Sequence, residues 1–101
     1  MIGEIKIENL ISSSAIVSKS AFLGKNVTID HYAIIEDNVK IGDNTTIGAN
    51  THIKPFTTIG KNCKIFNGAV LGEIPQDLKF ENEHSELIIG DFTTIREYCT
   101  L

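Results

Sequence analysis

The side chains best suited to bind a polar ligand lie in an acidic segment near residue 80. Asp77 and Lys79 alternate with the apolar residues Leu78 and Phe80. We therefore expect both polar side chains to project to one side while the apolar pair anchors the segment. A carboxylate accepts hydrogen bonds from sugar hydroxyls, and a lysine two residues away can bind a diphosphate. The alternative is an exposed ion pair, which contributes little to stability.

Histidines and cysteines complete the set of residues that could react. His31, His52 and His84 could supply a general base or, together, the three ligands of a zinc ion. Cys63 and Cys99 are too few for a disulfide framework and lack paired metal-ligand spacing, so we interpret them as buried reduced thiols. Which of these groups meet depends on the fold.

A period of six residues dominates the sequence. Aliphatic residues recur at every sixth position over two stretches of the chain. They are Ile11, Val17, Leu23, Ile29, Ile35, Ile41, Ile47, Ile53, Ile59, Ile65 and Leu71, followed by Ile89, Ile95 and Leu101. Steps of six wander around an α-helix instead of holding one face, so the period indicates short strands that each turn after six residues.

The other positions of the hexad fit a narrow prism. The residue three after the aliphatic is repeatedly Asn, which tolerates the left-handed backbone of a tight turn. The residue four after it is small or β-branched, which suits a narrow interior. Three hexads would make one 18-residue coil, and adjacent coils would stack as parallel strands about 4.8 Å apart. We therefore predict an all-β parallel prism of about four coils.

The same register places the histidines away from the interior. His31 follows the inward Ile29 by two residues, and His52 follows Ile47 by five, so both fall at outward or corner positions on one side. His84 lies in a polar segment, where a solvated side chain is the common case. We therefore expect no zinc site, no cofactor and no histidine base in this chain.

The repeat is interrupted between Leu71 and Ile89. Three ordinary hexads would fit the spacing, but Asp77 and Glu83 would then enter the core as unpaired charges. We interpret residues 73–88 as one hexad with about 12 extra residues that loop out from a single domain, residues 1–101, with hexads 11–72 and 89–101. Five acids and Lys79 give this segment a charge of −4, equal to that of the whole chain. Such a loop is either a functional element or a tolerated surface insertion.

The hexads resemble those of the hexapeptide-repeat family. In that family an aliphatic residue is followed by Gly, Ala, Glu or Asp, then by two variable residues and a small residue. The resemblance implies a left-handed parallel β-helix and a homotrimer. Handedness does not follow from the period, since parallel crossovers are usually right-handed.

A more specific resemblance covers Gly72-Glu-Ile-Pro-Gln-Asp-Leu-Lys-Phe80, Ile89-Gly-Asp and Ile95-Arg-Glu-Tyr-Cys-Thr-Leu101. These segments are similar to the acyl-carrier-protein:UDP-N-acetylglucosamine O-acyltransferases. That family moves a 3-hydroxyacyl chain from acyl carrier protein to the sugar's 3-hydroxyl, the first step of lipid A biosynthesis, in clefts between subunits of a homotrimer.

The resemblance also implies roles for single residues. Asp77 and Lys79 match loop residues that contact the nucleotide sugar, and Gln76 is a weaker third match. The family's histidine base would follow Leu101, where a new hexad begins. We therefore expect the chain to be an N-terminal piece of a longer protein, truncated at its C-terminus, and to be inactive alone.

Composition excludes other classes of partner. The chain has 9 basic and 13 acidic residues, which argues against nucleic-acid binding. No apolar run approaches the roughly 18 to 20 residues that span a bilayer, and no signal peptide is present, so we expect no membrane insertion and a cytoplasmic location. The acidic loop is also a poor docking surface for an acidic acyl carrier protein.

Several alternatives stay open. The chain could belong to an N-acyltransferase that acts on an amino-sugar nucleotide, or it could be a non-catalytic β-helix fragment. A zinc-dependent carbonic anhydrase on the same prism would need all three histidines. A threonine face that binds ice is disfavoured, because steps of 18 give Thr28, Thr46, Lys64 and, after the insertion, Thr94.

Overall fold

The structure is a computed structural model that describes residues 9–72 and 86–101. Within these ranges, thirteen short β-strands are joined by tight turns. The strands are β1 (Leu10–Ile11), β2 (Ile16–Val17), β3 (Phe22–Leu23), β4 (Thr28–Ile29), β5 (Ile34–Ile35), β6 (Lys40–Ile41), β7 (Thr46–Ile47), β8 (His52–Ile53), β9 (Thr57–Ile59), β10 (Lys64–Ile65), β11 (Val70–Leu71), β12 (Leu87–Ile89) and β13 (Thr94–Ile95).

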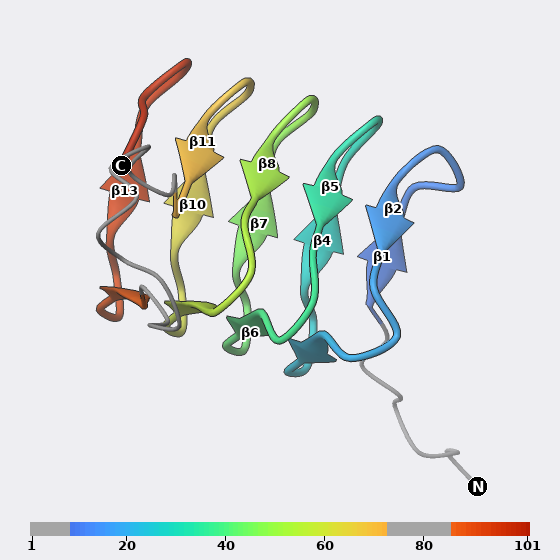
Figure 1. Ribbon diagram of the computed structural model, residues 1–101, viewed down its shortest axis with the longest axis horizontal. Helices are drawn as coiled ribbons and strands as arrows, with labels where there is room; N and C mark the ends of the chain where they lie inside the picture. The colour runs from blue at the N-terminus through green and yellow to red at the C-terminus, as the bar shows by residue number, and fades with distance from the viewer. Residues whose placement is uncertain (1–8, 73–85) are drawn as a thin grey trace, which may run out of the picture.

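Every third strand joins the same parallel sheet. The first sheet has the order β1-β4-β7-β10-β13, the second β11-β8-β5-β2 and the third β12-β9-β6-β3. The chain therefore visits the three sheets in turn and advances by one coil each time, as Figure 1 shows. This arrangement confirms the predicted parallel prism of short strands.

The pairing of strands before and after the insertion gives the number of extra residues. Neighbouring strands pair at a separation of 18 residues, as in Thr28 with Thr46, until Lys64 pairs with Thr94 at a separation of 30. The difference is the 12 extra residues that the sequence predicts. One boundary differs, because Leu87 and Ile88 pair with β9 and belong to the sheet, although we assigned both to the loop. Their backbone hydrogen bonds make the strand longer than the hexad pattern indicates.

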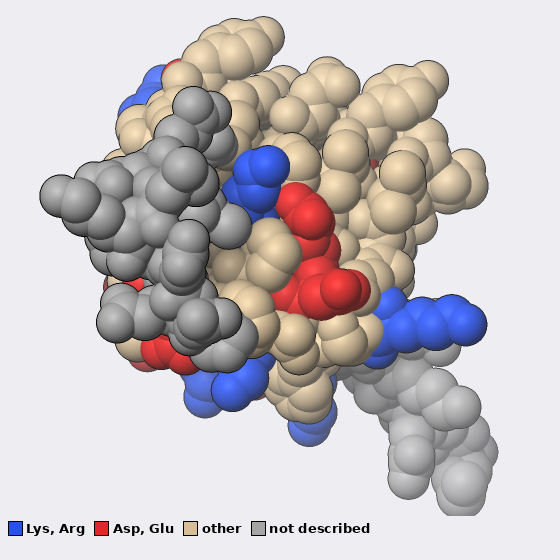
Figure 2. All heavy atoms as spheres, in the orientation of Figure 1, with Lys and Arg blue, Asp and Glu red and all other residues tan. Residues whose placement is uncertain are grey.

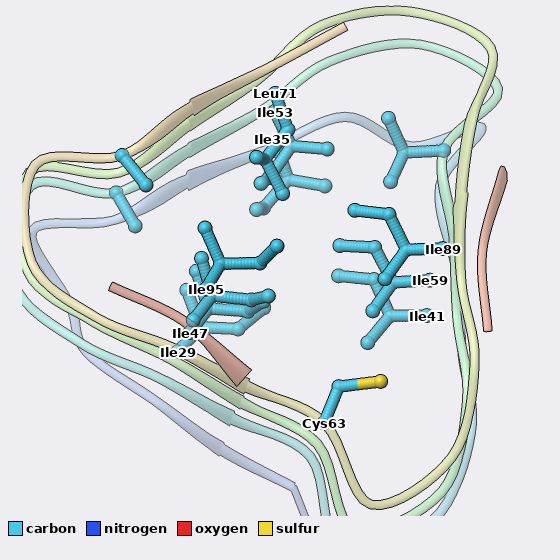
Figure 3. Packing of buried hydrophobic residues seen from close by; sticks show 14 of the residues in the cluster. Ile29, Ile35, Ile41, Ile47, Ile53, Ile59, Cys63, Leu71, Ile89 and Ile95 are labelled. Atoms are coloured by element: carbon cyan, nitrogen blue, oxygen red, sulfur yellow. The ribbon is translucent and has the colours of Figure 1, made fainter. Parts of the chain in front are cut away.

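The interior consists of three stacks of aliphatic side chains, one from each sheet. Figure 3 shows Ile29, Ile47 and Ile95 in one stack, with the stacks of the other two sheets facing it. The inward aliphatics from Ile29 to Leu71 are at most 2% exposed. At the two ends of the described stack, Ile11 and Leu101 are 43% and 46% exposed, because no described coil covers them.

The turns share one backbone conformation. The residue three after the inward aliphatic has a positive φ between 56° and 62° at nine positions: Asn26, Tyr32, Asn38, Asn44, Asn50, Phe56, Asn62, Phe92 and Tyr98. Asn is the residue that we predicted for this conformation. Four aromatic residues adopt it as well, because the hexad imposes the same turn at these nine corners. Ser14 and Ser20, at the equivalent positions of the first two described turns, do not adopt it.

None of the described residues forms a helix long and apolar enough to cross a membrane.

Candidate functional site

The three residues that the sequence assigns to substrate binding, Gln76, Asp77 and Lys79, lie outside the described residues. The structure does describe the two ends of the segment that carries them. The chain leaves the prism at Gly72, after β11, and returns at Glu86, before β12. The described surface next to this segment is the one around Gly72 and Glu86.

Gly72 fixes the point where the chain leaves the second sheet. Its φ is +86°, and a Cβ placed on it would lie 2.4 Å from Thr57 Oγ1 and 3.2 Å from the Cβ of Lys54. Its amide N–H donates to the carbonyl oxygen of Leu101 at 2.9 Å. Both the conformation and the lack of space require glycine, so the departure of the segment from the prism is set by local backbone geometry.

The hydroxyl of Thr57, next to Gly72, is buried without a hydrogen-bond partner among the described residues. Thr45 Oγ1 donates to the carbonyl oxygen of Gly60 at 2.8 Å, and Thr51 Oγ1 donates to the carbonyl oxygen of Phe66 at 3.4 Å. Each acceptor lies 15 residues after its donor. Thr57 continues this ladder, and the equivalent acceptor would be the carbonyl of Gly72. Among the described residues its Oγ1 has no partner, although Thr57 is fully buried. The departure of the chain at Gly72 thus interrupts an otherwise regular ladder.

Three ionisable side chains cluster next to Gly72, and one of them, Lys54, lies directly beside it. Glu36 Oε2 is 2.5 Å from His52 Nε2 and 3.9 Å from Lys54 Nζ. All three side chains are about one-third exposed. Figure 2 shows acidic and basic side chains meeting on this face of the molecule. We refer to Glu36, His52 and Lys54 as the E-H-K cluster.

We did not predict the E-H-K cluster from the sequence, although a signal for it exists. Glu36 and Lys54 are 18 residues apart, and so are Ile34 and His52, which pair directly between β5 and β8. Stepping by 18 along the outward positions would have brought these side chains together.

Glu86, which precedes β12, borders a groove of about 220 Å³. It is lined by Asn38, Lys40, Phe56, Thr58 and Glu86. An aromatic ring, an amide, a hydroxyl and two opposite charges suit a ligand with both polar and apolar faces, such as a sugar.

The histidines do not form a common site. His31 lies at the corner between the first and second sheets, where its Nδ1 is 2.8 Å from Ser12 Oγ. His52 lies on β8, past that corner, so the two do not share a side as we expected. His84 is outside the described residues, and within residues 9–72 and 86–101 no three His, Cys, Asp or Glu side chains are arranged to hold a metal ion.

The threonine column has the predicted interruption. Thr28 pairs with Thr46, which pairs with Lys64, and Lys64 pairs with Thr94. The lysine is exposed in the middle of the column. The first sheet therefore does not present the regular threonine array that ice binding requires.

Comparisons with known proteins agree with this architecture. The sequence matches the family described as bacterial transferase hexapeptide (six repeats) over residues 20–55 and 39–73. An acyl-[acyl-carrier-protein]--UDP-N-acetylglucosamine O-acyltransferase from Helicobacter pylori (strain HPAG1) is 60% identical over 45 residues, which are 45% of this chain and 17% of that protein.

Solved structures extend the similarity to most of the chain. A UDP-N-acetylglucosamine acyltransferase from Bacteroides fragilis is 47% identical with a TM-score of 0.85, over 90% of this chain and 36% of that one. The Francisella novicida UDP-N-acetylglucosamine acyltransferase is 36% identical with the same TM-score, over 90% of this chain and 33% of that one. The chain thus spans about a third of these relatives, and the match confirms a left-handed parallel β-helix.

The six-residue period, the three parallel sheets and the family match over residues 20–73 agree with one another, and the chain belongs to the bacterial transferase hexapeptide family.

Proposed function

We propose that the protein is part of an acyltransferase that moves a 3-hydroxyacyl chain from acyl carrier protein to the 3-hydroxyl of UDP-N-acetylglucosamine, the first step of lipid A biosynthesis. The observation that carries the proposal is the 47% identity over 90% of this chain to a UDP-N-acetylglucosamine acyltransferase. A shared hexad pattern alone would support only the fold.

The chemistry is an acyl transfer from sulfur to oxygen. The sugar hydroxyl attacks the thioester carbonyl, a general base takes the hydroxyl proton, and the carrier thiol leaves. In this proposal Asp77 accepts hydrogen bonds from the sugar, Lys79 binds the diphosphate, and Gln76 adds a further polar contact. The base is the histidine that the resemblance places after Leu101.

The direct test is to incubate the protein with 3-hydroxyacyl acyl carrier protein and UDP-N-acetylglucosamine and to identify the product by mass spectrometry. We expect an alkali-labile ester from the protein that the complete reading frame encodes and no product from the 101-residue chain alone. In a parallel incubation with an amino-sugar nucleotide in place of UDP-N-acetylglucosamine, an alkali-stable amide would instead identify an N-acyltransferase.

Substitutions in the insertion test the binding roles. Asp77→Ala and Lys79→Ala should each lower kcat/KM for the nucleotide sugar about tenfold or more, because each removes a charge-assisted contact. Glu83→Ala changes one charge in the same segment and should leave kcat/KM unchanged. If all three variants have the parent kinetics, the insertion has no role in binding the sugar.

The proposal includes a homotrimer in the cytoplasm. Three of the four side chains in one column of the second sheet are apolar, Ile16, Ile34 and Val70, with His52 between the last two, and Ile16 is 64% exposed. Burying such a column against another copy would remove apolar surface from water. Cys63 and Cys99 are both free thiols, as is usual in a reducing compartment. Light scattering should give a mass about three times that of one chain; a monomer would contradict the trimer.

A further inference from the structure

We propose that Lys54 of the E-H-K cluster binds the anionic group of the ligand, and that His52 controls its availability through Glu36. The inference rests on the proposed function, in which that anionic group is the diphosphate of a nucleotide sugar. It adds a binding residue on the prism itself and a pH dependence.

One carboxylate oxygen of Glu36 faces two cations. Its Oε2 lies 2.5 Å from His52 Nε2 but 3.9 Å from Lys54 Nζ. The first pair is within hydrogen-bonding distance, whereas the second is too far apart for a hydrogen bond. Among residues 9–72 and 86–101, the Lys54 ammonium thus has only this weak ion pair, and its three N–H donors can bind another acceptor.

The surroundings make these charges more effective than ordinary surface charges. His52 pairs with Ile34 on one side and Val70 on the other, so both of its direct strand partners are uncharged. Asp37, the next acidic group, is bonded to Ser18 and Ser20. Among the described residues, Glu36 and Lys54 are therefore the charges that face His52. Because all three side chains are about one-third exposed, solvent screens their interactions less than it screens fully exposed pairs.

The position of Lys54 relates it to the insertion. The Cβ of Lys54 is 3.2 Å from the site of a Cβ on Gly72, and the Lys54 amide N–H donates to the carbonyl oxygen of Leu71. Asp77 follows Gly72 by five residues, so covalent geometry keeps their Cα atoms within roughly 18 Å. Lys54 therefore lies beside the residue from which the insertion begins.

Protonation of His52 sets the sign of the effect. When the imidazole takes up a proton, its charge neutralises Glu36, and Lys54 is free to bind an external anion. When the imidazole is neutral, the charge of Glu36 remains available to Lys54 and competes with the anion. Anion affinity should therefore be higher when the imidazole is protonated than when it is neutral.

Two probes separate this inference from the proposed function. We would titrate the chain with sulfate, which keeps its two charges throughout, and with UDP-N-acetylglucosamine, at pH 5.5 and pH 8, and follow binding by NMR. Sulfate reports anion binding without a sugar. Far-UV circular dichroism of each variant verifies that it is folded.

The variants have distinct expected results. Lys54→Gln should weaken binding of both probes about tenfold at pH 5.5. Glu36→Gln should bind tightly at both pH values, and His52→Gln should lose the pH dependence while keeping the weaker affinity. Lys64→Gln removes an exposed lysine on the first sheet and serves as the matched control.

Each outcome decides between the two ideas. If Lys54→Gln binds sulfate like the parent chain, or if Glu36→Gln keeps the parent's pH dependence, the inference is wrong even where UDP-N-acetylglucosamine binds. If sulfate binding depends on Lys54 and pH as expected but the nucleotide sugar does not bind to the complete protein, the anion site stands and the proposed substrate is wrong.

Discussion

At the scale of single residues, the interior small column shows how the insertion changes local energetics. Thr45 and Thr51 donate to backbone carbonyls 15 residues ahead, and Cys63 Sγ contacts the carbonyl oxygen of Gly90 at 3.2 Å, which is 15 residues ahead once the insertion is subtracted. Thr57 alone in this run has no described partner for its hydroxyl. Identical side chains at equivalent positions therefore make different contributions to stability.

Replacing these threonines with valine should reveal the difference. Thr57→Val removes a buried hydroxyl that has no partner among residues 9–72 and 86–101, and it should raise the free energy of unfolding by about 1 kcal/mol. Thr45→Val should lower it by about 1 kcal/mol, because Thr45 Oγ1 donates to Gly60 and also accepts from the Cys63 amide at 3.2 Å. Urea denaturation of both variants measures the two values. Equal losses would mean that Thr57 has an acceptor after all.

Sequence reasoning identified this column but not its exception. The period of six predicts that Thr45, Thr51 and Thr57 are inward, and all three are fully buried. The expected acceptor is the carbonyl of Gly72, a residue whose φ is +86°. A pattern of residue types cannot specify that conformation, because glycine is compatible with both signs of φ.

At the scale of elements, the turns after the third sheet depend on glycine for close stacking. Gly24, Gly42, Gly60 and Gly90 occupy equivalent positions on successive coils. A Cβ on Gly42 would lie 2.6 Å from the carbonyl carbon of Gly60, whereas a Cβ on Gly90 would meet nothing within 4 Å. Backbone contact between coils, rather than an unusual φ, is the reason for glycine at Gly42.

This contact predicts opposite effects at two equivalent turns. Gly42→Ala should lower the free energy of unfolding by roughly 1 to 3 kcal/mol, because the methyl group cannot be placed without moving the neighbouring coil. Gly90→Ala should be neutral or stabilise by up to about 1 kcal/mol, since it restricts the unfolded chain without a clash. Thermal denaturation of the pair provides the comparison. A stable Gly42→Ala variant would show that the coils can separate locally.

Elements also explain which features of the site could be predicted. The insertion and its 12-residue excess follow from the repeat, and register confirms them. The E-H-K cluster was missed because Glu36 and His52 are 16 residues apart and belong to different hexads. They meet only after the chain has completed most of a coil. Residues about 18 apart in the sequence are therefore the relevant spatial neighbours in this fold, rather than residues a few positions apart.

At the scale of the whole molecule, the fold rests on one inward register kept through every described coil. The buried inward aliphatics form one cluster, so the core is a continuous stack rather than a set of independent units. The sequence predicts this register almost completely, since a shift of one residue would turn polar side chains into the interior. What it could not predict is handedness, which comes from the likeness to solved relatives.

Two adjacent residues on β7 test this register. Ile47 is fully buried in the middle of the stack, and Thr46 is exposed beside it. Ile47→Asp should abolish folding, because an unpaired charge in the core costs several kcal/mol and is transmitted to both neighbouring coils. Thr46→Asp adds the same charge outside, next to its strand partner Lys64, and should fold with nearly unchanged stability. Far-UV circular dichroism and gel filtration distinguish the two results, and a folded Ile47→Asp variant would require a different inward face.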